Sequence, residues 1–428
     1  MTPPEPPLVI FSPLPPAKSG IAAYTAELLP ALCARRPVVL VCEKGLTPEV
    51  QAALSPELAA LMATVPAPAL RILSATQYAT EQATLAASPH IYQIGNNRDH
   101  IFVYEAFVQR PGILVLHDFN LHYLIEDLTL VRGNPLRYSQ ILQQDYGEPG
   151  ATLADLRQIG IFSEAQKLAL PLNRHLLRQA TGIIVHNQWV WHRLPAHVRS
   201  RALVLPHHYS PQVAEVAGLS QAEARQQLGL PAEGFIVLSL GFITPPKQIQ
   251  STLAALACLK RWGKPAHFVI AGERNAGFDI DGLIRQHGLE AQVTITGYVP
   301  ESAFFRYIVA ADCLVNLRHP TVGESSGTLT RALALGLPAL VYNFGPCAEF
   351  PSDVVLKVPL ELAQDGEPES LAVALARLLR DADLRQRMSQ AASAYMKATC
   401  SVAHSAEAYL RFALSQGKAH PLSEGAAM

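Results

Sequence analysis

The sequence predicts an α/β protein with two doubly wound domains, each built on a parallel sheet. The chain has 428 residues, more than one core accommodates, because single cores stop growing near roughly 250 to 300 residues. It is 49% hydrophobic and only 16% charged, a balance typical of a filled globular interior. Short β-rich runs alternate with longer helical patterns, which indicates βαβ units.

The first domain is expected at residues 1–207. Its candidate strands are short apolar runs, namely Leu8 to Ser12, Val38 to Cys42, Ile91 to Ile94, Ile113 to Leu116, Ile183 to His186 and Leu203 to Leu205. The segment from about 119 to 177 has helical periodicity and little strand signal, so we expect a helical insertion there. The run Pro206 to Pro211 reads as a connector.

The second domain is expected at 208–399. Ser220 and Glu223 stand at capping-box spacing before the helix Gln221 to Leu228. The strands of this domain are expected at Phe235 to Leu240, His267 to Ala271, Val293 to Thr296, Cys313 to Asn316 and Ala339 to Val341. A terminal helix is expected at 400–416, and residues 417–428 read as a disordered tail.

Composition excludes several classes of partner. The net charge is −1 and no block of basic residues occurs, so we do not expect a nucleic-acid partner. The first seven residues lack the order of a signal peptide, and no apolar run reaches the roughly 18 residues of a membrane span. We therefore expect a cytoplasmic protein and leave peripheral membrane contact open. The six cysteines are scattered without a Cys-x-x-Cys pair, which favours reduced, packed thiols.

Polar residues follow three strands of the first domain. His117 and Asp118 end one strand, His186 ends another, and the pair His207-His208 follows the last. Because ligands bind outside the carboxyl ends of strands in open α/β sheets, these residues indicate a site.

Two loops could hold phosphate. Ser19 and Gly20 precede the helix Ile21 to Leu32, where backbone amides and the helix dipole favour an anion. In the second domain the loop Gly241 to Lys247 follows the first strand, and its lysine is a compact cation that can meet a diphosphate. No Gly-x-Gly-x-x-Gly fingerprint follows the first strand, so a dinucleotide is not expected there.

A third loop combines an anion nest with a carboxylate. Small residues from Gly323 to Thr328 precede the helix Leu329 to Leu335, and Glu324 lies among them. A carboxylate beside a nest needs a ligand other than phosphate, and sugar hydroxyls fit that need.

Two Asp-x-Asp strings, Asp279 to Asp281 and Asp381 to Asp383, precede helical runs. Asp is a favoured N-cap residue, and neither string ends a buried strand. We therefore expect helix caps and no Mg²⁺ or Mn²⁺ site.

In this order the motifs resemble those of the retaining GT-B glycosyltransferases numbered four in the usual classification, the glycosyl transferases group one. The similarity runs over nearly the whole chain. The matching motifs are Pro15-Pro16 through Ser19-Gly20-Ile21-Ala22 to Tyr24, Gly95-Asn96-Asn97 to His100, His117-Asp118, Val185-His186-Asn187, Pro206-His207-His208, Gly241 to Lys247, Gly297-Tyr298-Val299, and Gly323-Glu324 through Gly336-Leu337-Pro338.

The resemblance implies two Rossmann-like domains facing a central cleft. The donor would bind the C-terminal domain and the acceptor the N-terminal domain, and the terminal helix would cross back to the N-terminal domain. Lys247 would hold the donor diphosphate, Glu324 the sugar hydroxyls, and His117 would sit beside the sugar, which makes these three the catalytic candidates. The backbone around Tyr298 and Val299 would meet the base.

Further site residues follow from the same likeness. The donor side would also include Ser19, Gly20, Gly241, Ser325, Ser326, Gly327, Thr328 and Arg331. The acceptor side would include Asn96, Asn97, His100, Asp118, His186 and Asn187. The chain departs from the family pattern at two positions: Phe242 stands where many members have Arg, and Arg331 or Ala332 stands where many have a second Glu. Which group binds the ribose is therefore unassigned.

The expected reaction moves a hexose-like sugar from a UDP- or GDP-linked donor to an acceptor hydroxyl, with retention and without metal or cofactor. The acceptor would be a glycan, a lipid-linked molecule or a small molecule, as in polysaccharide or glycoconjugate biosynthesis. Two alternatives stay open. A nucleotide-sugar epimerase could use His117, Asp118 and His186 as acid and base groups. A non-catalytic sugar-nucleotide or glycan-binding partner would explain the missing Arg and Glu.

Overall fold

The computed structural model describes residues 5–17, 19–45, 69–275, 277–360 and 369–416. These residues form two compact units. Unit 1 contains the chain up to Pro206, the short segment Val322–Ser325, and the chain from Val402 onward, whereas unit 2 contains His207–Thr321 and Ser326–Ser401. The tail 417–428, predicted to be disordered, lies outside the described residues.

Unit 1 is built on a seven-stranded sheet of order β3-β2-β1-β4-β5-β6-β7, in which all neighbouring strands are parallel. Its strands are β1 (Leu8–Phe11), β2 (Val38–Cys42), β3 (Leu70–Ser74), β4 (His90–Ile94), β5 (Ile113–Leu116), β6 (Gly182–Val185) and β7 (Ala202–Val204). In β1, Val9 and Phe11 enter one apolar core and Leu8 and Ile10 the other. Continuous apolar strands form here because both sheet faces are covered.

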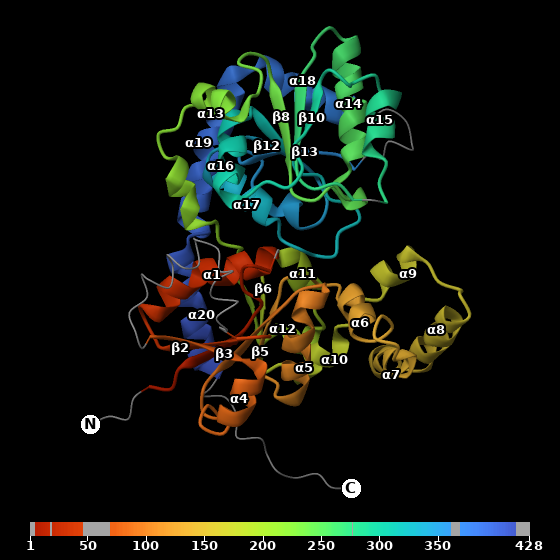
Figure 1. Ribbon diagram of the computed structural model, residues 1–428, viewed down its shortest axis with the longest axis vertical. Helices are drawn as coiled ribbons and strands as arrows, with labels where there is room; N and C mark the ends of the chain where they lie inside the picture. Colours follow the sequence, from red (N-terminus) through yellow and green to blue (C-terminus); the bar gives the residue numbers. More distant parts are fainter. Residues whose placement is uncertain (1–4, 18, 46–68, 276, 361–368, 417–428) are drawn as a thin grey trace. The chain divides into compact units, whose positions relative to one another are not determined.

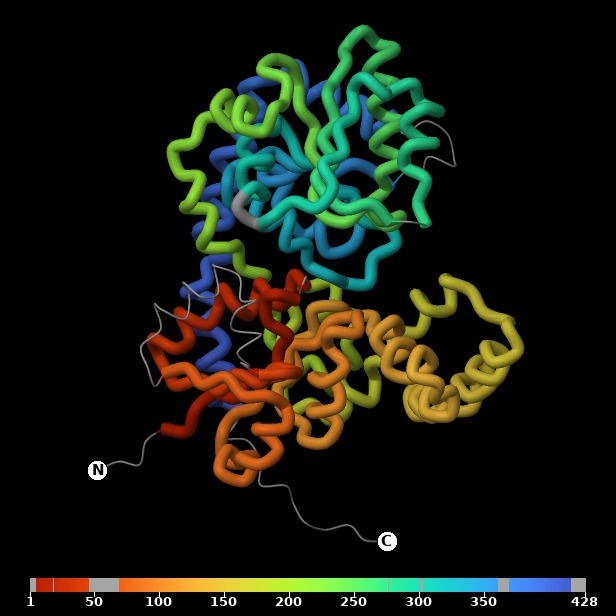
Figure 2. The backbone as a smooth tube through the Cα atoms, in the orientation of Figure 1, coloured from red at the N-terminus to blue at the C-terminus, as the bar shows by residue number. Residues whose placement is uncertain are grey.

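Helices cover both faces of this sheet (Figure 1). They are α1 (Gly20–Cys33), α4 (Ala75–Glu81), η1 (Arg98–His100), α5 (Ile101–Gln109), α6 (His122–Leu128), α7 (Pro135–Tyr146), α8 (Glu148–Gln158), α9 (Glu164–Ala169), α10 (Arg174–Gln179), α11 (Gln188–Arg193), α12 (Ala196–Arg199) and α20 (Val402–Gln416). The backbone trace in Figure 2 shows α20, in blue, beside α1, in red. Within this contact the hydroxyls of Tyr24 and Tyr409 lie 3.2 Å apart.

The helices α6 to α10 occupy the predicted insertion. A buried ion cluster joins three of them: Glu126 on α6 pairs with Arg157 on α8 at 2.5 Å and with Lys167 on α9 at 3.1 Å. Each charge has an opposite partner, so the attraction within the cluster largely offsets the cost of burying it. The cluster therefore fixes how these helices pack and adds little to the free energy of unfolding.

Unit 2 is built on a six-stranded parallel sheet of order β10-β9-β8-β11-β12-β13. Its strands are β8 (Ile236–Leu240), β9 (His267–Ala271), β10 (Val293–Ile295), β11 (Cys313–Val315), β12 (Ala339–Tyr342) and β13 (Val355–Val358). On one side of β8 the sheet continues with β9 and β10, and on the other side it continues with β11, β12 and β13. The neighbours β8 and β11 therefore form the topological switch point of the sheet.

Figure 1 shows α14 and α15 on one side of this sheet and α13, α16 and α19 on the other. The helices of unit 2 are η2 (Pro211–Val216), α13 (Gln221–Leu228), η3 (Pro245–Lys247), α14 (Ile249–Arg261), α15 (Ile280–Gln286), α16 (Glu301–Ala310), α17 (Gly327–Ala334), η4 (Pro346–Glu349), α18 (Glu369–Arg380) and α19 (Ala382–Thr399). The predicted capping box of Ser220 and Glu223 opens α13. The six cysteines are free thiols, five of them buried.

Candidate active site

The loop after β8 contains the first predicted donor-binding residues of unit 2. Gly241 directly follows β8 at the switch point and has φ +85°, a left-handed value that favours glycine. A Cβ atom on Gly241 would lie 2.9 Å from Nζ of Lys247, and a Cβ atom on Gly272 would lie 2.0 Å from the Gly241 carbonyl oxygen. The two glycines therefore keep the loops after β8 and β9 close together and leave room for the ammonium group.

Lys247 ends the 3-10 turn η3 and points back toward β8. Its Nζ donates a hydrogen bond to the carbonyl oxygen of Leu240 at 2.5 Å. Burial, and after it the positive charge of Arg318, lower the pKa of Lys247 well below its ordinary value of 10.5. An anion bound here would restore the affinity of Lys247 for its proton.

Arg318 follows β11, the strand beside β8, and we did not predict it as a site residue. Its Nε atom is buried and has no hydrogen-bond partner among the described residues. The signal was present in the sequence, because Arg318 comes two residues after the predicted strand Cys313 to Asn316. The strand-end rule that selected His117 would have selected it as well.

The helix α17 begins at the same end of unit 2. Its N-cap Ser326 accepts a hydrogen bond from Leu329 N and donates one to Oδ1 of Asn316 at 3.0 Å. Gly327 and Thr328 begin the first turn, and Arg331 folds back so that its Nη1 donates to the Gly327 carbonyl at 3.4 Å. The predicted nest is thus a helix start with a nearly buried cation beside it.

Glu324 and Ser325 lie in the segment Val322–Ser325, which packs in unit 1 although its sequence neighbours belong to unit 2. The predicted span 208–399 did not anticipate this excursion. Backbone N–H groups of Phe119 and Asn120 donate to the Val322 carbonyl at 2.8 and 3.0 Å. These hydrogen bonds attach the segment to the loop that follows β5.

Asn187 and Gly323 fix the segment further. The side-chain amide of Asn187 donates to the Gly323 carbonyl at 3.2 Å and to Oγ of Ser325 at 3.0 Å. A Cβ atom on Gly323 would lie 2.6 Å from Cβ of Phe119, so only glycine permits this packing. Within the segment, Oε2 of Glu324 accepts from Val322 N at 3.0 Å. Glu324 is partly buried and oriented by its own loop.

His117 lies at the carboxyl end of β5 in a buried aromatic and polar cluster of unit 1. Its Nε2 donates to Oε1 of Gln93 at 2.7 Å, because the amide oxygen can only accept. The Gln93 amide nitrogen donates in turn to the Tyr409 hydroxyl at 3.4 Å. The rings of Tyr24 and His186 lie 4.9 and 4.6 Å from the His117 ring, centroid to centroid. Protein groups thus set the position and tautomer of His117.

Most other predicted acceptor-side residues use their polar atoms inside unit 1. Asp118 accepts from Asn96 N at 2.7 Å, and Asn96 Oδ1 accepts from Leu124 N. Asn97 is exposed and caps η1. His100 is fully buried, its Nδ1 contacts the Gln93 carbonyl, and burial lowers its pKa to about 4. His186 Nδ1 lies 2.9 Å from the Leu205 carbonyl.

The predicted phosphate turn of unit 1 begins α1. Ser19 is its N-cap and accepts from Ile21 N, and a Cβ atom on Gly20 would meet no atom within 4 Å. A cavity of about 280 Å³ lies beside this turn, at the carboxyl ends of β1 and β2. It is lined by Pro13, Leu14, Pro15, Pro16, Ala17, Cys42, Glu43, Lys44, Gly45, Ile72, Asp99 and Phe102.

Tyr298 and Val299 follow β10 in unit 2. The Tyr298 ring is 56% exposed, and Val299 packs against the apolar core of the sheet. The predicted contact of Tyr298 with a base stays a prediction.

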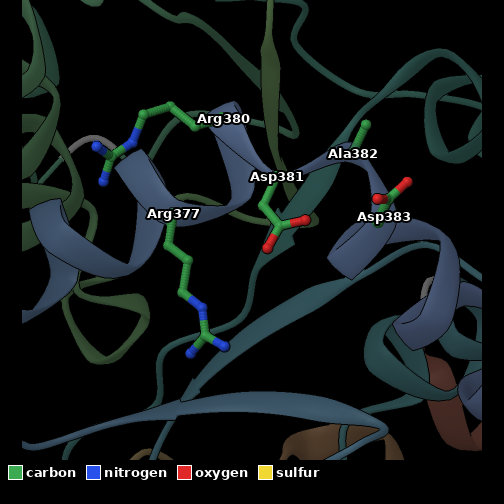
Figure 3. A pocket seen from close by; sticks show the side chains of 5 residues that line it. All are labelled: Arg377, Arg380, Asp381, Ala382 and Asp383. Atoms are coloured by element: carbon green, nitrogen blue, oxygen red, sulfur yellow. The ribbon is translucent and has the colours of Figure 1, made fainter.

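The two Asp-x-Asp strings cap helices. Asp279 Oδ1 accepts from Gly282 N at the start of α15, and Asp381 Oδ1 accepts from Leu384 N at the start of α19. Figure 3 shows the second string in a pocket with two arginines, where the carboxylates of Asp381 and Asp383 do not converge. Over the part of the chain that the structure describes, no group of three His, Cys, Asp or Glu side chains is arranged to hold a metal ion.

Comparison with known proteins agrees with this architecture. Residues 220–395 match the family model described as glycosyl transferases group 1. The 2-deoxystreptamine glucosyltransferase of Streptomyces kanamyceticus is 28% identical over 220 residues, which are 50% of this chain and 55% of the relative. The alpha-D-kanosaminyltransferase of the same organism is 30% identical over 174 residues, 40% of this chain and 43% of the relative. The chain therefore spans about half the length of the curated relatives it matches.

The fold itself is shared over almost the whole chain. Sucrose-phosphate synthase from Thermosynechococcus elongatus superposes with a TM-score of 0.63 at 18% identity, covering 96% of this chain and 100% of that one. At this identity the likeness shows the fold alone, and it confirms the predicted GT-B class. No helix among the described residues is long and apolar enough to cross a bilayer.

Proposed function

We propose that this chain, whose residues 220–395 match the family model of the glycosyl transferases group 1, transfers a hexose-like sugar from a nucleoside diphosphate donor to an acceptor hydroxyl. The observation that supports this most directly is the Lys247 ammonium at the switch point of unit 2. It lies in a glycine-lined loop, and among the described residues it donates a hydrogen bond to a backbone carbonyl and forms no ion pair with a carboxylate. A cation placed there suits the charge of a leaving diphosphate.

Catalysis would be positional and electrostatic. The bond between the anomeric carbon and the diphosphate oxygen breaks, the diphosphate takes the electron pair, and Lys247 stabilises the charge that develops. The acceptor hydroxyl attacks from the same face, so the anomeric configuration is retained, and its proton leaves with the departing diphosphate. Glu324, oriented by Val322 N, would hold donor hydroxyls, and His117, fixed by Gln93, would border the sugar.

The names of the two Streptomyces kanamyceticus relatives describe transfer of glucose and of kanosamine. They support a hexose or amino-hexose on the donor and a small polyol or sugar as acceptor. The base would be uracil or guanine, met beside Tyr298. We further propose that transfer needs no divalent ion and takes place in the cytoplasm, and we leave contact with a membrane surface open.

A thermal-shift screen against UDP- and GDP-linked sugars tests donor binding, since a ligand that binds only the folded state raises the melting temperature. The best donor is then incubated with polyol and sugar acceptors, and the anomeric configuration of the product is read by proton NMR. Product with retained configuration, formed equally in EDTA, supports the proposal. Nucleotide binding without transfer to any acceptor would instead favour a non-catalytic binder, and interconversion of the donor sugar an epimerase.

A further inference from the structure

We propose that Arg318 is the second cation of the diphosphate site and grips the donor diphosphate together with Lys247. The inference rests on the proposed function, because it assigns a new residue to the same donor site. Below, these two side chains are called the cation pair.

Two hydrogen bonds join the loop of Arg318 to the turn of Lys247. The backbone N–H of His319 donates to the Pro246 carbonyl at 2.9 Å. The side-chain amide of Gln248 donates to the His319 carbonyl at 2.7 Å. Each bond links a residue adjacent to one cation with a residue adjacent to the other. These two bonds hold the backbone segments that carry Lys247 and Arg318 next to each other.

Within the described part of the chain the pair has no internal counter-ion. Among the described residues neither Lys247 nor Arg318 forms an ion pair with a carboxylate, whereas Arg225 in the same unit is paired with Asp312 at 2.7 Å. The Arg318 Nε–H is buried without an acceptor. The repulsion between two like charges and the unsatisfied N–H raise the free energy of the empty site. A bound anion relieves both, so the arrangement favours the anion-bound protein over the empty one.

The chemistry of the pair favours a diphosphate over a single anionic group. A guanidinium presents a planar fork that contacts two oxygens at once, and an ammonium acts as a point charge. Together they match two linked phosphate groups. Phe242, next to Gly241, is apolar and 48% exposed, so the loop after β8 contributes only one cation and the loop after β11 supplies the other.

Calorimetry with UDP, GDP, UMP and GMP tests the assignment. The variants are Arg318→Gln, Arg318→Lys and, as a matched control, Arg377→Gln, which removes an exposed arginine from the separate pocket of Figure 3. For the diphosphate that the wild type binds best, Arg318→Gln should weaken affinity by about ten- to a hundredfold. The corresponding monophosphate should lose clearly less. Arg318→Lys should recover part of the loss, and Arg377→Gln should match the wild type.

The outcomes separate the two proposals. If wild-type protein binds none of the four nucleotides, the proposed function fails. If it binds a diphosphate but Arg318→Gln binds it equally well, or loses diphosphate and monophosphate affinity by the same factor, the assignment of Arg318 fails while the donor site stands. Circular dichroism and the melting temperature of each variant distinguish lost contacts from lost folding. If Arg318→Gln does not fold, Arg318→Lys provides the test. Lysine keeps the positive charge but lacks the planar guanidinium fork, so this variant should still bind the diphosphate several-fold more weakly than wild type.

Discussion

The cation pair of unit 2 and the His117 cluster of unit 1 differ in whether protein groups satisfy their hydrogen-bond donors. At the cation pair the buried Arg318 Nε–H has no acceptor among the described residues, so a ligand must complete its hydrogen bonding. Around His117 the chain from Tyr409 through Gln93 satisfies the imidazole N–H before any ligand arrives. The comparison suggests that unit 2 gives up stability for affinity toward an anion, whereas unit 1 fixes a geometry and leaves the ligand less specified.

The largest effect is expected when the side-chain amide of Gln93, which links His117 to Tyr409, is removed. Gln93→Leu leaves the His117 N–H and the Tyr409 hydroxyl without that partner inside the core, so the free energy of unfolding should fall by about 2 to 4 kcal/mol. Urea denaturation measures it. Gln158→Leu, an exposed glutamine of the same unit, is the control. Equal stability of the two variants would show that the His117 chain contributes nothing to the fold.

Lys247→Met should weaken binding of the diphosphate and, unlike Gln93→Leu, should stabilise the empty protein. The diphosphate loses a charge-assisted hydrogen bond, which corresponds to about 1.5 to 3 kcal/mol of weaker binding in calorimetry. Lys397→Met, at an exposed position on α19, controls for removal of a positive charge. Unchanged diphosphate affinity in Lys247→Met would remove this residue from the site.

The same substitution should stabilise the empty protein, by about 1 kcal/mol at pH 7. The folded-state pKa of Lys247 is lowered by burial and by Arg318, so the charged form destabilises the fold. That penalty is complete below the folded pKa and disappears as pH rises toward the unfolded value near 10.5. Stability curves of wild type and variant should therefore converge at alkaline pH. A variant that is less stable than wild type at pH 7 would contradict the strained state of the cation pair.

Glu324→Gln should have the smallest effect on folding, no more than about 0.5 kcal/mol. The amide oxygen of glutamine can still accept from Val322 N, as the carboxylate does. If the carboxylate orients donor hydroxyls, turnover should fall while affinity for the free nucleoside diphosphate, which lacks the sugar, stays the same. Steady-state rates and calorimetry separate these quantities. Normal turnover would assign the carboxylate to loop structure alone.

Sequence patterns located the inner strands and the edge strands β7 and β10, but they missed one edge strand in each sheet. Val38–Cys42 and His267–Ala271 are continuous β-branched or apolar runs, and their bounds match the prediction. The edge strands Leu70–Ser74 and Val355–Val358 were missed. Each contains a charged residue, Arg71 or Lys357, and is only partly buried, so neither has the continuous apolar run by which a buried parallel strand is recognised.

For the candidate site, the sequence indicated residue types near strand ends but not their surroundings. Lys247 and Glu324 stand out in loops of small residues, and the structure gives each a defined hydrogen bond. His100 was predicted to be an acceptor-side residue, yet it is fully buried in unit 1. Burial of a single histidine and the proximity of Arg318 to Lys247 both depend on tertiary contacts between distant segments. No local pattern encodes such contacts.

Unit 1 is assembled from three separate stretches of the chain, and this affects how it folds during synthesis. Synthesis delivers β1 to β7 first, and then all of unit 2 emerges before α20, whose Tyr409 contacts Tyr24 and Gln93. Domains that are continuous in sequence can fold as they leave the ribosome, amino-terminal ones first. Unit 1 must instead wait for residues 402–416, so its Gln93 and Tyr24 stay without their last partner until synthesis is nearly over. The amino-terminal half of this protein should consequently be the later of the two to reach its final stability in the cell.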